Sequence, residues 1–321
     1  MLPAPIAWSC SAALARFEHA GPNAVTASIA RRGRSTVRSM QVNASLLKLL
    51  GSPKSIRVVL ARRIIRRLSL FSYRDRLKLC AVRRPHYAHC IFEAAQLAAR
   101  LNYPRMSVIE FGCGGGNGLI DAEMHIAEIR EIFPVEIELY GFDTGSGLPP
   151  AQDYRDFAHY FRPGLYSMDR SALERRLRIA KLVIGDVNDT CKTFFEAYNP
   201  APVGCVFHDL DFYSSTRAAL TLFDTEPAHL LPRIFMYFDD VTGDNTWLVS
   251  EFAGELLAID EFNREHRSKK IAANRYMRVE YPDQWGWTDR VFIHHDFEHP
   301  DYNMFVAGRE QEGLQAGIRL R

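Results

Sequence analysis

The 321-residue sequence lacks the features that define several large classes of protein. It contains no run of about 18 apolar residues, so we expect no membrane-spanning segment. Its six cysteines are scattered and form no C-x-x-C pair, which argues against both a structural zinc site and a disulfide scaffold. This cysteine usage fits a reducing compartment, and we expect a cytoplasmic protein.

Acidic residues are scarce in the first quarter of the chain. Residues 1–85 hold 17 of the 40 Lys and Arg but only two of the 38 Asp and Glu. Residues 1–39 are rich in Ala, Ser and Arg without apolar periodicity, which predicts disorder. They fit either a transit-type presequence or a start assigned too early, with Met40 the true beginning, and we favour the second. Residues 40–85 are expected to form a basic helical extension.

Within this extension, the stretch from Ser55 to Leu70 predicts a basic amphipathic helix. Its apolar side carries Val58, Leu60, Ile64, Ile65 and Leu68, and the opposite side carries Arg62, Arg63, Arg66 and Arg67. Such a helix could attach to an anionic membrane surface or to nucleic acid. It could also pack on the following domain with its arginines in solvent, and we favour this second interpretation.

Strand and helix patterns alternate over residues 86–310, before a short tail at 311–321. The predicted strands are 107–111, 136–142, 180–186, 203–211, 233–240, 275–280 and 290–294. Predicted helices include 118–132, 248–262, and 171–179, where Ser171 and Glu174 form a capping box. This alternation predicts an α/β fold with a doubly wound, Rossmann-like sheet of seven strands.

The glycine-rich turn after the first of these strands reads "VIEFGCGGGNGLI". The dinucleotide fingerprint G-x-G-x-x-G fails here, because Asn117 or Leu119 stands where its third glycine should be, and no P-loop follows. The pattern that fits is E-x-G-x-G-x-G, formed by Glu110, Gly112, Gly114 and Gly116. An acid at the strand end suits a cationic ligand, such as an ammonium near a sulfonium, better than a pyrophosphate. The glycines permit close approach of that ligand to the backbone.

Acidic residues also follow the next four strands. Ligands of such sheets bind beyond the carboxyl ends of the strands, where Asp143, Asp186, Asp209 and the pair Asp239-Asp240 should gather. Three carboxylates at adjacent strand ends repel one another unless a cation neutralises them. Hard oxygen donors without nearby cysteine or paired histidine indicate Mg²⁺ or a similar ion.

With these motifs, the sequence resembles the class I S-adenosylmethionine (SAM)-dependent methyltransferases over about residues 86–305. It is most similar to the macrocin O-methyltransferase family and its cephalosporin-hydroxylase-like relatives, through "YGFDTGSGLPP", "DLDFYSSTRAAL" and "YFDD". The resemblance implies that Asp143 binds the ribose hydroxyls of SAM and that Asp186 lies beside its adenine. It also implies a homo-oligomer. The sequence departs from the family at Gly145, where an aromatic residue is common.

The resemblance further implies that a metal is bound by Asp209, Asp239 and Asp240, with Asp211 as the alternative ligand. A metal would lower the pKa of an acceptor hydroxyl and fix its direction. The alternative is structural: Asp239 and Asp240 simply end a strand and Asp211 caps a helix. His208 is either a general base or a packed residue.

Two further segments carry candidate functional residues. His294, His295 and His299 with Asp296 suggest either a second metal site or, as we favour, an edge strand or a wall of the acceptor pocket. The stretch "YFRPGLYSMD" is long enough for an active-site lid, in which Arg162 and Tyr166 would contact substrate.

The sequence is compatible with three functions. The first, which we favour, is a Mg-assisted, SAM-dependent O-methyltransferase acting on a hydroxyl of a small molecule such as a sugar or glycosylated metabolite. The second is a nucleic-acid methyltransferase that grips its substrate through the basic N-terminal region. Residues 86–321 carry 36 acids against 23 bases and lack an N-P-P-Y-type motif, which argues against it. The third is a non-catalytic SAM-binding or hydroxylase-associated module.

Overall fold

The computed structural model describes residues 53–68, 71–281, 285–308 and 317. The predictions for residues 1–39 and for most of the tail at 311–321 lie outside these ranges. The described residues fall into two compact units, with the boundary between Val82 and Arg83.

In its described residues, the first unit contains two helices, α3 (Pro53–Arg67) and α4 (Tyr73–Lys78). Helix α3 confirms the predicted basic helix, and it ends with Arg66 and Arg67. Four residues of its apolar side are exposed by 44% to 61%: Val58, Leu60, Ile64 and Leu68. The apolar side of α3 therefore contributes little to a core. Helix α4 begins at Ser72, whose hydroxyl accepts a hydrogen bond from the backbone N–H of Asp75.

The second unit is built on a seven-stranded sheet, as the sequence predicts. The strands are β1 (Arg105–Phe111), β2 (Glu136–Asp143), β3 (Lys181–Ile184), β4 (Val203–His208), β5 (Leu230–Phe238), β6 (Lys269–Ala273) and β7 (Val291–Asp296). Their order is β3-β2-β1-β4-β5-β7-β6. Strands β1 to β5 run parallel, and β7 is antiparallel to both of its neighbours. The carboxyl ends of the five parallel strands therefore meet at one edge.

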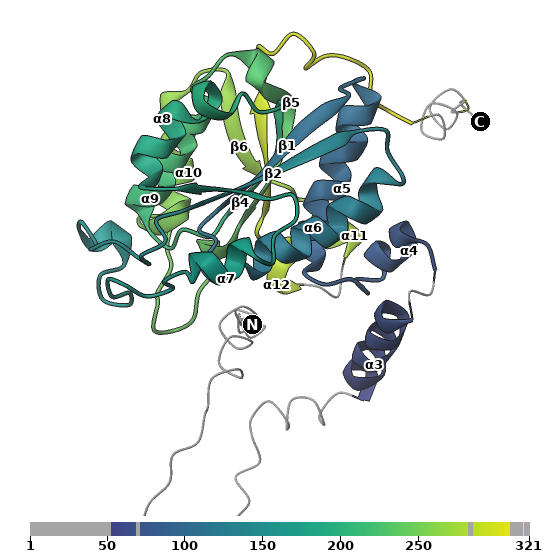
Figure 1. Ribbon diagram of the computed structural model, residues 1–321, viewed down its shortest axis with the longest axis horizontal. Coiled ribbons are helices and arrows are strands. Elements are labelled where there is room, and N and C mark those ends of the chain that lie inside the picture. The colour runs from purple at the N-terminus through teal and green to yellow at the C-terminus, as the bar shows by residue number, and fades with distance from the viewer. Residues whose placement is uncertain (1–52, 69–70, 282–284, 309–316, 318–321) are drawn as a thin grey trace, which may run out of the picture. The chain divides into compact units, whose positions relative to one another are not determined.

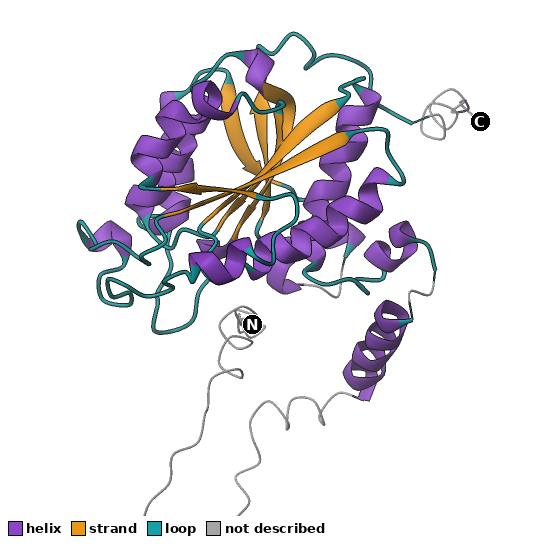
Figure 2. Cartoon of the chain, viewed as in Figure 1, coloured by secondary structure: helices purple, strands orange, loops and turns teal. Residues whose placement is uncertain are grey.

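Helices cover both faces of this sheet (Figures 1 and 2). On one face, α5 (Pro85–Arg100) packs against α6 (Asn117–Arg130) and over β4 and β5. On the other lie α8 (Val187–Tyr198), α9 (Tyr213–Leu220) and α10 (Gly254–Glu265). Shorter elements are α7 (Arg170–Glu174), α11 (Met277–Glu280), α12 (Trp285–Thr288) and the 3-10 turns η2 (Tyr154–Asp156), η3 (Thr221–Phe223), η4 (Pro227–His229) and η5 (Asp239–Val241). The core between the sheet and α8–α10 is aromatic, with Phe142, Phe194 and Phe238 buried.

One predicted element in the last third of the chain is wrong, and a second is correct in type but begins later than predicted. Residues 275–280 form helix α11 instead of a strand, after a turn in which the Asn274 side chain accepts the N–H of Tyr276. The strand lies earlier, at β6, whose sequence KKIAA carries little strand propensity and which is held by pairing with β7. Helix 248–262 begins only at Gly254, because the residues before it form a loop.

The predicted capping box at Ser171 and Glu174 is also wrong. Helix α7 begins one residue earlier, and Asp169 caps it by accepting the N–H of Ala172 at 2.9 Å. Glu174 pairs with Arg170, 2.7 Å away, instead of reaching back to the helix start. Ser171 therefore lies inside the helix, where it cannot act as the N-cap.

Candidate functional site

The glycine-rich turn lies between the end of β1 and the start of α6, as predicted. Gly112, Gly114 and Gly116 have φ angles of +79°, +47° and +73°, which L side chains rarely adopt. A Cβ on Gly112 would lie 1.8 Å from the backbone oxygen of Asp209. The N–H of Asp209 in turn donates to the backbone oxygen of Phe111 at 3.0 Å. Glycine at position 112 thus lets the ends of β1 and β4 meet.

Asp143, at the end of β2, joins this turn through its side chain. One carboxylate oxygen accepts the N–H of Gly114 at 2.8 Å, and the other accepts the N–H of Gly145 at 2.6 Å. Each oxygen keeps a further lone pair, so the half-buried carboxylate can still accept hydrogen bonds from a ligand. Gly145 has a φ of +75°, a backbone conformation that explains why an aromatic residue does not occupy this position.

Glu110 is buried, with 2% of its surface exposed, and does not lie open to the turn. Its Oε1 accepts the hydroxyl of Tyr87 at 3.0 Å, while its Oε2 has no hydrogen-bond partner among the described residues. Burial raises the pKa of Glu110 to about 8, with further repulsion from Asp143. Tyr87, which the sequence analysis did not single out, stacks on Phe207 with ring centroids 3.8 Å apart.

Asp186 follows β3 and stands at the N-cap of α8. Its side chain is exposed and caps the helix by accepting the N–H of Asn188 at 2.8 Å. The structure therefore shows a capping role for Asp186, and a contact with a cofactor stays a prediction.

Asp209, Asp239 and Asp240 come together beyond the ends of β4 and β5. Each offers a carboxylate oxygen, and these three oxygens lie within 4.8 Å of one another. Asp209 is exposed, Asp239 is half-buried and Asp240 is buried. We call these three residues the aspartate cluster. Across the described ranges, no other group of three or more His, Cys, Asp or Glu has this geometry.

One oxygen of Asp239 is held by Arg290, which directly precedes β7, and by Tyr237 of β5. Its Oδ1 accepts hydrogen bonds from Nη1 of Arg290 at 2.6 Å and from the hydroxyl of Tyr237 at 2.9 Å. Arg290 is 3% exposed, and its Nε donates to the hydroxyl of Thr242 at 2.8 Å. The sequence analysis missed Arg290, because nothing near it in the chain indicates that β7 lies beside β5.

Asp240 is held from two other directions. Its Oδ2 accepts the N–H of Asp211 at 2.9 Å, and its own N–H donates to Oε2 of Glu255 at 2.9 Å. The buried Asp211 has a φ of +60° and its carboxylate is not part of the cluster. The predicted cap by Asp211 is wrong, because Phe212 precedes α9 and no side chain caps it.

These carboxylates strongly affect one another. The pKa of Asp209 is raised well above its ordinary value. The first cause is the loss of hydration next to the surrounding protein, and the second is repulsion from Asp239 and Asp240. The pKa of Asp240 is raised by burial and then by Asp211 and Asp239. Without a cation, the cluster therefore favours protonated forms, and a bound cation would favour the ionised forms.

His208 does not lie in this site. Its imidazole is fully buried, stacked on Phe238 at 4.4 Å and 5.3 Å from Phe111. Burial lowers its pKa to about 3, and neither ring nitrogen has a hydrogen-bond partner in the described part of the chain. This placement does not support the predicted role of His208 as a general base.

The three histidines near the end of the chain have three different sets of neighbours. His294 is buried and stacks on Phe223, His295 bonds the hydroxyl of Tyr302, and His299 bonds the backbone oxygen of Pro227. Strand β7 lies inside the sheet between β5 and β6, so the expected edge strand is wrong. These histidines do not form a second metal site.

The loop at residues 144–169 carries the predicted lid. Its two arms are joined by hydrogen bonds between Leu148 and Leu165 and between Gly164 and Leu148. Tyr166, 60% exposed with a φ of +63°, lies beside Gly114. The pKa of the Tyr166 hydroxyl is raised to about 12, first by surrounding protein and then by acids that include Asp211 and Asp209. Arg162 is exposed.

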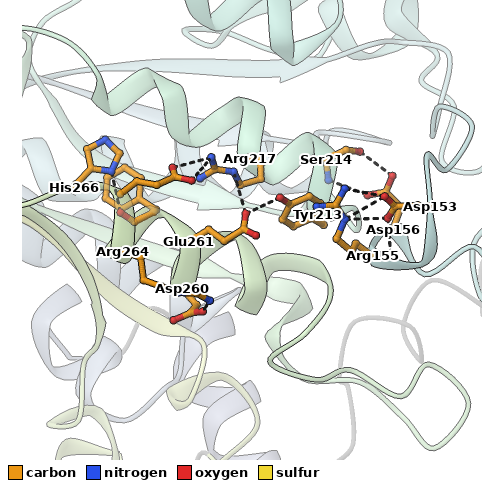
Figure 3. Close-up of polar contacts among 12 residues, drawn as sticks. Asp153, Arg155, Asp156, Tyr213, Ser214, Arg217, Asp260, Glu261, Arg264 and His266 are labelled. Carbon is orange, nitrogen blue, oxygen red and sulfur yellow. Dashed lines mark hydrogen bonds and ion pairs between the residues drawn. The ribbon is translucent and has the colours of Figure 1, made fainter.

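This loop is anchored firmly to the rest of the domain. Figure 3 shows buried Asp156, which accepts the N–H of Ser214 at 2.8 Å and its hydroxyl at 2.9 Å at the start of α9. Arg155 pairs with Asp153 and lies over the ring of Tyr213. Residues of this loop also join a buried hydrophobic cluster, formed by Phe157, Phe161, Phe212, Trp247 and Ala253.

The order of the seven strands confirms the predicted α/β fold with a doubly wound sheet. No protein-family model and no curated protein sequence matches this chain. The finer likeness to the macrocin O-methyltransferase family therefore stays a prediction. No described helix is long and apolar enough to cross a membrane.

The chain is similar to several solved structures, at low identity. CalS11, a calicheamicin methyltransferase, is 18% identical over 74% of this chain and 91% of its own, with a TM-score of 0.40. MycE, a methyltransferase of the mycinamycin pathway solved with Mg, SAH and mycinamycin VI, is 13% identical over 89% and 70%, with a TM-score of 0.35. An O-methyltransferase from Bacillus cereus, solved with SAH, is 12% identical over 79% and 95%, with a TM-score of 0.33. Similarities of this size carry no conclusion about this chain.

Proposed function

We propose that this chain is a SAM-dependent O-methyltransferase assisted by Mg²⁺. The observation that supports the proposal most is the convergence of two arrangements at one edge of the sheet. The glycine turn, closed by Asp143, follows β1, and the aspartate cluster follows β4 and β5. They meet where Gly112 approaches the backbone of Asp209.

The residues around the glycine turn fit SAM. Gly112, Gly114 and Gly116 leave the backbone open to close approach, and the free lone pairs of Asp143 suit the two ribose hydroxyls. Glu110 lies buried beside the turn, where a cationic ligand end would favour its ionised form, and Asp186 would lie towards the adenine. When bound, SAM would supply an electrophilic methyl group, which passes to an acceptor oxygen as its bond to the sulfonium sulfur breaks and the neutral thioether leaves.

The aspartate cluster fits a hard divalent cation. It offers only oxygen donors, and the mutual repulsion of its members, seen in the raised pKa values of Asp209 and Asp240, would be relieved by positive charge. When bound, Mg²⁺ lowers the pKa of an acceptor hydroxyl and fixes its direction. Arg290 and Glu255 hold Asp239 and Asp240 in place, and the exposed Asp209 is the member that faces the acceptor.

We further propose that the acceptor is a hydroxyl of a small molecule, such as a sugar or a glycosylated metabolite. The loop at 144–169 supports a small acceptor, because the bonds of Asp156 and the hydrophobic cluster fix it in place while its Tyr166 lies beside Gly114. The acidic balance of residues 86–321 disfavours a nucleic-acid substrate. The scattered cysteines of the sequence, which form no C-x-x-C pair, support our proposal of a cytoplasmic enzyme.

Two proposals concern partners. We propose that α3 contacts an anionic membrane surface peripherally, because its exposed apolar side faces away from a row of arginines. Co-sedimentation with vesicles containing anionic lipid, compared with neutral vesicles, tests this contact. We also propose a homo-oligomer, on the resemblance alone, and sedimentation equilibrium tests it.

Binding of SAM to the full chain, followed by calorimetry, tests the proposed function. We expect micromolar binding that Asp143→Ala abolishes and that Asp260→Ala leaves unchanged. Asp260 is a matched control because it is exposed on α10, where it pairs only with Arg264 among the described ion pairs. Absence of SAM binding to the native chain, with and without Mg²⁺, would overturn the proposal.

A further inference from the structure

We propose that Glu255 is a positioning residue for the aspartate cluster, acting through the backbone of Asp240. This inference rests on the proposed function, since it concerns the cation that the cluster would hold. Glu255 lies in the first turn of α10 and is not one of the acids that follow the strands.

The environment of Glu255 is unusual for an acid at a helix start. The side chain is 0% exposed, Oε2 accepts the N–H of Asp240 at 2.9 Å, and Oε1 has no hydrogen-bond partner among the described residues. Acids stabilise the first turn of a helix by a few tenths of a kcal/mol to about 1 kcal/mol when they are near the surface. A buried carboxylate with one unsatisfied oxygen costs more than this gain. Local helix stability therefore does not explain Glu255.

The neighbours of Glu255 make this cost larger. Its partner Asp240 belongs to a cluster of three acids, so a further buried acid at this position meets like charge. An apolar residue would pack here without repulsion. The placement is instead understandable if the side-chain oxygen is needed to hold the backbone N–H of Asp240.

The hydrogen bonds show what Glu255 controls. It fixes the N–H of Asp240 in the 3-10 turn η5, and Asp240 in turn accepts the N–H of Asp211 after β4. Glu255 thereby links the start of α10 to the ends of β5 and β4. Asp239 is held independently by Arg290, from β7. Each member of the Asp239-Asp240 pair thus has its own support, and loss of Glu255 releases only the Asp240 side.

Binding of Mn²⁺ to the full chain, followed by the electron paramagnetic resonance of the free ion, tests this role. Removal of a residue that orients a metal ligand typically weakens metal affinity by about 10- to 100-fold. We expect this loss for Glu255→Leu, and an intermediate loss for Glu255→Asp, whose shorter side chain withdraws from Asp240. Glu255→Gln keeps an oxygen that accepts the N–H of Asp240. Its Mn²⁺ affinity should therefore stay within about threefold of the native value, a far smaller change than removal of an orienting residue causes.

The controls separate positioning from folding and from the proposed function. Asp260→Ala on the same helix should bind Mn²⁺ as the native chain does, and all variants should bind SAM equally. Native Mn²⁺ affinity in Glu255→Leu, or in Glu255→Asp should the leucine variant fail to fold, would overturn the role of Glu255 while the proposed function stands. A native chain that binds SAM but no Mn²⁺ would overturn the metal site and this inference together. A native chain that binds neither would overturn the proposed function itself.

Discussion

Gly112 and Asp209 meet so closely that a single added carbon would separate them: a Cβ on Gly112 would lie 1.8 Å from the backbone oxygen of Asp209. The contact joins the glycine turn after β1 to the first member of the aspartate cluster after β4. Residues proposed to hold a cofactor and residues proposed to hold a cation are thus fixed relative to each other by backbone.

Gly112→Ala should therefore damage both halves of the site. The alanine must adopt a φ near +79° and displace the end of β4, so we expect destabilisation of about 2–4 kcal/mol. Urea denaturation measures the loss, and binding of SAM and of Mn²⁺ should both weaken. Gly286→Ala is the control, because a Cβ there meets no atom within 4 Å and the residue lies in helix α12. Unchanged stability in Gly112→Ala would contradict the proposed close approach.

Arg290→Met should leave Asp239 as an uncompensated acid. The pair is largely buried, with side chains 4% and 14% exposed, so we expect a loss of about 3 kcal/mol in the free energy of unfolding. Added Mg²⁺ should recover part of this loss if the cluster binds the ion, since a ligand of the native state stabilises it. Thermal denaturation with and without Mg²⁺ measures both effects. A variant as stable as the native protein in the absence of Mg²⁺ would show that Arg290 does not support Asp239.

Glu110 should make stability depend on pH. Burial raises its pKa from 4.5 to about 8 in the folded chain, so between these values the folded chain keeps a proton that the unfolded chain releases. Stability is then highest at low pH in this window and falls as pH rises from about 4.5 to 8, by up to about 1.4 kcal/mol per pH unit for one proton.

Glu110→Gln removes this group while keeping an acceptor for Tyr87. Urea denaturation at intervals between pH 5 and 8 should give a shallower fall in stability for the variant than for the native chain. Equal slopes for the two proteins would mean that Glu110 is already ionised when folded. The comparison of slopes isolates Glu110 from the aspartates, which are present in both proteins.

His208→Phe tests the core placement of the imidazole. An unsatisfied buried polar group costs about 1–3 kcal/mol, and a phenyl ring of similar size could stack on Phe238 without that cost. We expect equal or higher thermal stability, with SAM and Mn²⁺ binding and any methyl transfer preserved. Loss of methyl transfer at native stability and native binding would restore a catalytic role for His208.

The sequence predicted the sheet and the positions of the strand-end acids well, for one physical reason. Parallel strands that alternate with helices bring their carboxyl ends to one edge, so Asp143, Asp209 and Asp239 could be placed there without coordinates. Strand β6 was missed because its residues have little strand propensity and its place depends on pairing with β7. Long-range pairing of that kind leaves no local pattern.

The supporting residues of the site could not be predicted for the same reason. Tyr87 reaches Glu110 from α5, Glu255 reaches Asp240 from α10, and Arg290 reaches Asp239 from the start of β7. None stands near its partner in sequence. The burial of His208 could have been predicted from the continuous apolar run of β4. A strand covered on both faces buries all of its residues, including the last.

The central claim is that one edge of the sheet holds SAM and a divalent cation side by side. Broadening of the SAM methyl proton resonance by Mn²⁺ bound to the full chain tests it most directly, because a paramagnetic ion broadens only nearby nuclei. We predict strong broadening in the native chain, and its loss in Asp239→Asn with SAM binding intact. A methyl resonance that stays sharp while both SAM and Mn²⁺ are bound would place the two ligands apart and contradict the account.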